Sequence, residues 1–191
     1  MFFPTVKAYT QVTRYKKVGL ESITVREVRI PDDRVGVLIG EGGETKNRIE
    51  EDTQCELEIK DNHVKIEGEP LEEMTAQKIV KAIGRGFNPV KAFKLAEENF
   101  EYHQLDIGKF ADTPNSQGRL KGRVIGRDGE ARKHVEKMTE TDISVYGKTV
   151  GFIGHVENIQ ICQEAVKMLL NGRSHATTYD YLEKNQGRIR R

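Results

Sequence analysis

Two matching stretches decide the fold, IGEGGE at residues 39–44 and IGRDGE at residues 125–130. They are offset by 86 residues, and the same offset continues without a gap on both sides. The identical pairs include Gly36 and Gly122, Glu50 and Glu136, Thr53 and Thr139, Val64 and Val150, Gly68 and Gly154, and Gly86 and Gly172. A register that holds over about fifty residues indicates a duplicated unit, and two copies are too few for a solenoid.

The residues around the first stretch predict a fixed order of elements. Val28 and Ile30 alternate with polar residues as in a strand, and Pro31 ends it. Asp33 is placed to cap a short helix that ends at Ile39, where the glycines interrupt the chain. A second helix follows, and the remaining apolar positions predict a hairpin and a closing helix: Cys55, Leu57, Ile59, Val64 and Ile66, then Leu71, Met74, Ile79 and Ile83.

The second copy repeats this order with different flanks. Its first strand is expected at residues 105–107, because the register fails upstream of residue 33. A loop over residues 108–117 should then precede its first helix. Between the copies, apolar residues at helical spacing predict a connecting helix over residues 90–102, and a short helix is expected at residues 177–183.

The chain is thus predicted to be an α+β protein of two tandem domains joined by a helix. Each domain has the order strand, helix, helix, strand, strand, helix. The predicted segments are an N-terminal extension (1–22), a first domain (23–87), a connecting helix (88–103), a second domain (104–173), and a C-terminal short helix with a basic tail (174–191).

A Gly-x-x-Gly loop between two helices is a device for holding a phosphate. Glycine removes the Cβ that would keep a ligand away from the backbone, and it accepts the angles of a tight turn. The second helix then directs its free N–H groups and positive dipole end toward the same space. A loop of this kind that clamps single-stranded nucleic acid is the arrangement of a KH domain. One such motif is a weak signal, but two in register within this element order are a strong one.

Net charge is unevenly distributed along the chain. The whole sequence carries a net charge of +1. Residues 1–103 hold 16 lysines and arginines against 19 acidic residues, whereas residues 104–191 hold 15 against 11. The net charges are therefore −3 and +4, and a phosphate backbone responds to the local field rather than to the global sum.

The two glycine loops differ in the same direction. Net charge is −1 over residues 33–47 and +4 over residues 119–133, and Glu41 lies inside the first loop. We therefore expect the second loop to dominate RNA binding. The predicted RNA-binding residues are Arg119, Lys121, Gly122, Arg123, Gly126, Arg127, Asp128, Gly129, Arg132 and Lys133. For the first loop, RNA and a protein partner both remain open, at Gly40, Glu41, Gly42, Gly43 and Lys46.

Base recognition should come from a groove beside the second loop. Its floor is expected to consist of Val124, Ile125, Arg132, Val135, Ile143 and Val145. Most of these side chains also have to fill the core, so packing is the more common role for any one of them.

Several segments of the sequence resemble a known protein family. The glycine loops and element order resemble type I KH domains. The segments GRLKGRVIG (118–126), ISVYGKTV (143–150) and HATTY (175–179) resemble the archaeal counterpart of Partner of Nob, a small-subunit ribosome assembly factor. The resemblance runs from about residue 22 onward and is most specific in the second domain and its tail.

This resemblance implies a function and a set of partners. It implies binding to the 3′ region of small-subunit ribosomal RNA, beside the Nob endonuclease that cuts the precursor and near a dimethyltransferase acting on the same RNA. It assigns the RNA backbone to residues 126–129, with Arg119, Lys121 and Arg123 ahead of them. Glu41 departs from the usual basic pattern, which leaves room for a protein partner at the first loop.

Three other function classes fit the sequence less well. An enzyme is disfavoured, because neither GxGxxG nor a Walker motif fits. The five histidines show no i, i+4 pair suited to a metal, and the sequence indicates no Ser/His/Asp arrangement. We therefore expect no cofactor. A general KH adaptor in RNA degradation or translation is the main alternative. A protein-interaction module with KH folds that no longer bind RNA is the third, and the basic second loop argues against it.

Composition sets the remaining expectations. Hydrophobic residues make up 36% of the chain and charged residues 32%, which suits small cores with a solvated surface. No apolar run has membrane-spanning length, and no signal peptide is evident, so we expect a cytoplasmic protein. We also expect it to be a monomer. Cys55 and Cys162 have no cysteine or histidine companions and are interpreted as small apolar fillers.

Overall fold

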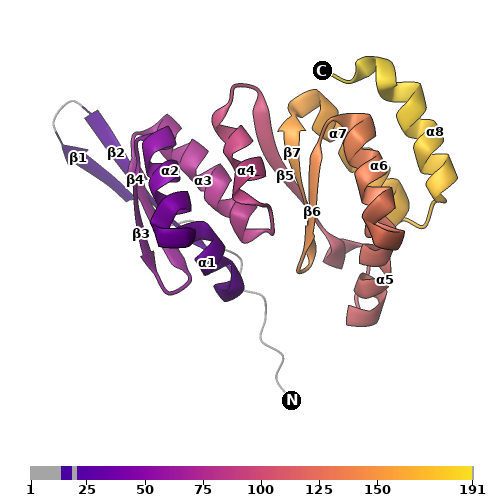
Figure 1. Ribbon diagram of the computed structural model, residues 1–191, viewed down its shortest axis with the longest axis horizontal. Coiled ribbons are helices and arrows are strands. Elements are labelled where there is room, and N and C mark those ends of the chain that lie inside the picture. Colours follow the sequence, from indigo (N-terminus) through magenta and orange to yellow (C-terminus); the bar gives the residue numbers. More distant parts are fainter. Residues whose placement is uncertain (1–13, 19–20, 191) are drawn as a thin grey trace. The chain divides into compact units, whose positions relative to one another are not determined.

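The computed structural model describes residues 14–18 and 21–190, and the chain divides between Gly84 and Arg85 into two compact units (Figure 1). Each unit is described by itself. Most of the predicted N-terminal extension lies outside the described residues. Within the described residues, no helix is long and apolar enough to cross a membrane, and no group of three or more His, Cys, Asp and Glu residues could hold a metal ion.

The first unit has helices packed on one antiparallel sheet. Its sheet has the order β1-β2-β4-β3, and β3 and β4 form the predicted hairpin. The elements are β1 (Arg14–Val18), β2 (Glu21–Arg29), α1 (Asp32–Ile39), η1 (Glu41–Gly43), α2 (Glu44–Thr53), β3 (Glu56–Lys60), β4 (His63–Gly68) and α3 (Pro70–Gly84). The predicted order from β2 to α3 is confirmed, and β1 is an additional strand paired with β2.

The second unit repeats this architecture and adds a helix at its end. Its sheet has the order β5-β7-β6, which matches β2-β4-β3 of the first unit. The elements are α4 (Pro89–Ala92), η2 (Phe93–Ala96), β5 (Phe100–Asp106), η3 (Ile107–Lys109), α5 (Pro114–Ile125), η4 (Arg127–Gly129), α6 (Glu130–Thr139), β6 (Asp142–Tyr146), β7 (Thr149–His155), α7 (Val156–Leu170), α8 (His175–Asn185) and η5 (Gln186–Arg188).

The predicted connecting helix is confirmed for its first half, residues 89–96, and is wrong after that. Helical structure ends at Ala96, the chain turns at Asn99 with a φ of 70°, and β5 begins at Phe100. Phe100 and Tyr102 pair with β7 instead of continuing a helix. Over this short stretch the spacing of the apolar residues fits either a helix or a strand. Pairing with β7 makes it a strand.

Two predicted details of the first helices are also corrected. In the second unit α5 begins at Pro114, four residues before the end of the expected loop, because Thr113 and Ser116 form a capping box. In the first unit α1 begins at Asp32 with Pro31 at the N-cap position, so Asp33 lies in the first turn instead of capping it. An acidic residue in a first turn still favours the helix through its dipole.

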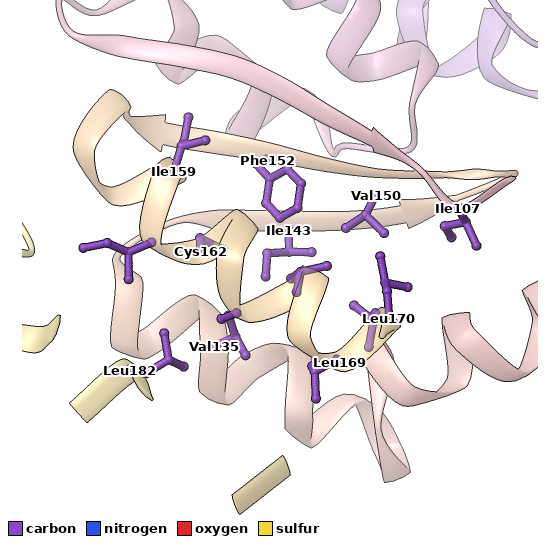
Figure 2. Close-up of a cluster of buried hydrophobic side chains, with 14 of the residues drawn as sticks. Ile107, Val135, Ile143, Val150, Phe152, Ile159, Cys162, Leu169, Leu170 and Leu182 are labelled. Carbon is purple, nitrogen blue, oxygen red and sulfur yellow. The ribbon is translucent and has the colours of Figure 1, made fainter. Parts of the chain in front are cut away.

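The core of the second unit lies between its sheet and helices α5, α6, α7 and α8. Figure 2 shows the strand residues Ile143, Val150 and Phe152 and the helix residues Val135 and Leu169 in one cluster. Both cysteines are buried and free, as expected for apolar fillers. The C-terminal helix belongs to this core, because its Leu182 is only 1% exposed. It is longer than the predicted 177–183.

The basic tail is tied to α7 as far as residue 190. The Asn158 side chain, which is fully buried, accepts a hydrogen bond from the Arg190 N–H and donates one to the Arg190 carbonyl, each over 2.8 Å. Ile189 packs against the core cluster. The backbone of the tail is therefore held against α7 up to residue 190.

A double ion pair fixes the start of β6. Lys91 Nζ lies 2.7 Å from Asp142 Oδ1, and Lys94 Nζ lies 2.7 Å from Asp142 Oδ2. Burial works against the charged carboxylate, but the hydrogen bonds and positive charges of both lysines outweigh it and hold the pKa of Asp142 below its usual value.

This lowered pKa gives a pH-dependent prediction. A depressed carboxylate pKa contributes stability that is present above the unfolded-state pKa of about 4 and is lost as pH falls through the folded value. Asp142→Asn should therefore lower the free energy of unfolding by about 1–3 kcal/mol at pH 7, and the difference from wild type should shrink toward pH 2. Urea unfolding at both pH values measures it, and an equal difference at both would contradict it.

Candidate nucleic-acid interface

The two glycine loops have nearly the same backbone. Gly126 ends α5 with a φ of 74° and a ψ of 178°, and Gly40 ends α1 with 76° and 175°. Gly129 and Gly43 then begin the next helices at a φ of 77° and 89°. This combination of angles at the first glycine is essentially restricted to glycine, which explains why both copies retain it.

Close packing imposes a second demand for glycine at these positions. A Cβ added at Gly126 would lie 2.5 Å from Ala131 Cβ and 2.8 Å from the Ala131 backbone nitrogen. One added at Gly40 would lie 2.5 Å from Thr45 Oγ1. Glycine therefore allows the first turn of the following helix to pack onto the end of the preceding one.

The second loop leads into a helix start that has no side-chain cap. Gly129 is the N-cap residue of α6, and no side chain caps this end of the ten-residue helix. The Glu130 N–H donates to the Arg127 carbonyl within the loop. The remaining N–H groups of the first turn are available to an external acceptor, and the helix dipole favours an anion there. Arg127 and Asp128, between the glycines, are both exposed.

The predicted basic residues of the second loop are of three kinds: exposed, paired with a neighbouring group, or directed toward the end of α7. Arg119, Arg127 and Lys133 are exposed. Lys133 lies beside the loop, since a Cβ on Gly129 would be 3.9 Å from its Cε. Together with the exposed Gly122 and the half-buried Gly126 and Gly129, these residues make up the accessible part of the predicted site.

Lys121 and Arg132 have partners within the second unit. Lys121 Nζ donates to the Gly147 carbonyl in the β6–β7 turn over 3.0 Å. Arg132 Nε lies 3.7 Å from Glu136 Oε2, one helical turn away. Both side chains are half-buried, so a phosphate would have to compete with these partners.

The Arg123 side chain is directed toward the end of α7. Its Nε donates to the Leu169 carbonyl over 3.0 Å, and its Nη2 donates to the Arg173 carbonyl. Lys121, two residues earlier on α5, instead donates to the β6–β7 turn. The cluster that the sequence presents as one basic patch is therefore divided over two sides of α5.

The predicted groove floor is only partly accessible. Val124, Val135 and Ile143 are at most 3% exposed and belong to the core. Ile125 and Val145 are half-buried and remain available to a base, as does the Arg132 side chain. The packing role that was the more common expectation is the correct one for half of these residues.

The first unit offers acidic surroundings at the corresponding place. Glu41 is exposed within the loop, and Lys46 pairs with Glu50 over 3.3 Å. A cavity of about 460 Å³ lies beside α2, lined by Lys46, Glu50, Glu56, Leu57, Glu58, Lys65 and Glu67. Its second lysine, Lys65, is also ion-paired, with Glu67 at 3.1 Å.

A glutamate that repeats in both units has a structural role that the sequence analysis did not predict. Glu136 Oε1 accepts a hydrogen bond from the Ile143 N–H over 2.8 Å, and Glu50 Oε1 accepts one from the Leu57 N–H over 2.7 Å. Each carboxylate satisfies a backbone donor on the edge strand beside the groove. The signal was present, because donor and acceptor both repeat at the same offset of 86 residues.

Family models match both units. Residues 25–82 match the KH domain, and residues 99–187 match the eukaryotic type KH domain (KH-domain type I). With the glycine loops and sheet order above, these matches define a protein with two tandem type I KH domains. The second match extends over α8, so this helix falls within the family's domain.

Comparison with individual proteins narrows the family. A KH domain-containing protein of Methanocaldococcus jannaschii is 46% identical over 88% of this chain and 77% of its own length. The pre-rRNA-processing protein PNO1 of Chaetomium thermophilum is 27% identical over 85% of this chain and 66% of its own length. The crystal structure of Dim2p from Pyrococcus horikoshii is 38% identical, with a TM-score of 0.79 over 84% of this chain and 98% of that one. The chain belongs to the PNO1/Dim2 family of KH-domain proteins.

A further solved structure contains RNA. It is the complex of a/eIF2alpha, aDim2p and rRNA from the same archaeon, which matches with 36% identity and a TM-score of 0.82 over 87% of this chain and 96% of that one.

Proposed function

We propose that this protein is a non-catalytic assembly factor that binds the 3′ region of small-subunit rRNA during processing. The observation that carries the proposal is the second glycine loop, where the exposed Arg127 stands at the uncapped start of α6. Relatives named for pre-rRNA processing and a Dim2p structure with rRNA support it. A maturation endonuclease acting on the same precursor would then be a neighbour, as the resemblance implies.

The geometry suggests how the RNA is held. A phosphate at the loop would accept hydrogen bonds from the first-turn N–H groups of α6, while Arg127 and Lys133 supply positive charge. Bases following this phosphate would lie against the half-buried Ile125 and Val145. Phosphate contacts set the position of the strand, and contacts to base edges provide the sequence preference.

A binding titration tests this function. Single-stranded RNA from the 3′ end of small-subunit rRNA is compared with a scrambled strand of equal composition, at two salt concentrations. Tighter binding to the authentic strand at both concentrations is expected, because base contacts depend less on salt than phosphate contacts do. Equal, salt-sensitive binding to both strands would favour a general KH adaptor, and no binding to either would contradict an RNA-binding role.

The first loop allows a separate prediction. Glu41→Lys should leave RNA affinity unchanged or raise it up to about tenfold, since it replaces an exposed negative charge with a positive one at the position that matches Arg127. The same titration measures it, with Glu51→Lys on the exposed surface of α2 as a control for the change in net charge. A clear loss of affinity in Glu41→Lys alone would contradict the ranking of the two loops.

A further inference from the structure

Helix α8 lies outside the strand and helix order shared by the two domains, yet it touches the helix that carries the second glycine loop. The first unit ends with α3, whereas the second continues from α7 into α8. The first residue of α8, His175, places Nε2 2.9 Å from the Arg123 carbonyl oxygen, three residues before Gly126. One turn later on α8, the Tyr179 ring lies 4.1 Å from the His134 ring of α6, centroid to centroid.

The Arg123 carbonyl needs such a partner. In a continuing helix this oxygen would accept the N–H of residue 127, but the chain leaves the helix at Gly126. A carbonyl oxygen can only accept, so His175 Nε2 carries the hydrogen that it donates. His175 thus satisfies a carbonyl that the glycine turn leaves without its helical partner.

The Arg123 side chain makes the complementary connection. It donates to the carbonyls of Leu169 and Arg173, at the end of α7 and in the link to α8. These groups carry the negative end of the α7 dipole, which favours a guanidinium. Residue 123 therefore joins the ends of α5 and α7 and the start of α8, through its backbone on one side and its side chain on the other.

The first unit has a similar arginine contact, but it lies farther from the glycine loop. There Arg34 Nε donates over 2.8 Å to the carbonyl of Ile83, the residue that matches Leu169 in the repeat. Arg34 itself matches Leu120, one helical turn before the position of Arg123. Both units thus tie their first helix to the end of their closing helix, but the second does so closer to its glycine loop.

We propose that Arg123 and His175 form a latch in which α8 fixes the orientation of the second glycine loop for RNA. Arg123 is then a positioning residue and not a phosphate contact, which revises its place among the predicted RNA-binding residues. The latch deepens the proposed function and rests on it. Loop atoms held in place before binding lose less conformational entropy when RNA is bound.

Salt dependence separates a latch from a phosphate contact. Arg123→Gln should weaken binding of the 3′ rRNA strand about three- to tenfold, which corresponds to the loss of one or two net hydrogen bonds. The slope of log affinity against log salt should stay unchanged, whereas losing a phosphate contact reduces it by about one. Arg123→Lys should also bind less tightly, because an ammonium group cannot reproduce the two-carbonyl geometry.

Two further variants complete the test. His175→Ala should weaken binding to a similar degree, and Arg123→Gln with His175→Ala should lose less than the two single effects combined. Arg173→Gln is the matched control, because it removes an equal charge from an exposed side chain but keeps the backbone carbonyl that Arg123 uses. It should bind like the wild type.

A measurement without RNA keeps the latch distinguishable from the proposed function. Amide hydrogen exchange at residues 123–131 should speed up in Arg123→Gln and His175→Ala but not in Arg173→Gln, even if the wild type binds no rRNA at all. The latch is overturned if exchange there is unchanged, if Arg123→Lys binds as tightly as the wild type, or if Arg173→Gln loses as much affinity as Arg123→Gln.

Discussion

Gly126→Ala is expected to lower the free energy of unfolding of the second domain by about 3 kcal/mol or more. The backbone angles of Gly126 lie in a region that other residues enter at a cost of about 1–3 kcal/mol. The added methyl group would also lie 2.8 Å from the Ala131 backbone nitrogen, and forcing a carbon into a packed site costs about 1–3 kcal/mol. Chemical denaturation followed by circular dichroism measures the change.

Two other glycines provide the controls. Gly129→Ala should cost only about 1–2 kcal/mol, because its φ is 77° but the nearest atom to an added Cβ, Lys133 Cε, is 3.9 Å away. Gly118→Ala, on the exposed side of α5 with nothing within 4 Å, should be neutral or stabilising by up to about 1 kcal/mol. A Gly126→Ala variant as stable as Gly118→Ala would show that the turn is not constrained as described.

Arg127→Asp is expected to weaken rRNA binding about 10- to 100-fold, which corresponds to about 1–3 kcal/mol. Arg127 is exposed between the loop glycines, so the variant loses a phosphate contact and gains a repulsive charge without disturbing the core. Its stability should stay within about 0.5 kcal/mol of the wild type. Binding titrations over a range of salt concentrations measure both the affinity and the slope, and the slope should fall by about one.

A charge-matched variant controls for the change in net charge. Lys184→Asp makes the same substitution in charge on an exposed residue in the last turn of α8. It should reduce affinity by less than about threefold, through long-range electrostatics alone. If both variants lose the same affinity, the second loop has no specific part in binding.

The architecture could be predicted because the local signals agreed with the repeat. Both glycine loops, the helices on either side, the hairpins and the closing helices lie where the spacing and turn residues place them. The second half of the predicted connecting helix was wrong, because its apolar residues fit a helix and a strand equally well over so few positions. Pairing of Phe100 with His155, 55 residues away, decided the outcome, and no local pattern records that pairing.

The site could be predicted less completely than the fold. Sequence spacing identifies Arg127, Gly126 and Gly129 because the loop itself is local. It does not show that Arg123 donates to carbonyls about 50 residues further along the chain, or that Lys121 reaches the β6–β7 turn. A run of basic residues on a helix thus looks like one patch in the sequence, although the neighbours of the helix divide it.

The central claim is that the second glycine loop holds the rRNA backbone. Amide hydrogen exchange of the full chain, with and without a saturating 3′ rRNA strand, tests it most directly. The account predicts the strongest new protection at residues 126–133, where the loop and the first turn of α6 would donate to a phosphate. Saturated binding that leaves residues 126–133 as exchangeable as in the free protein would contradict it.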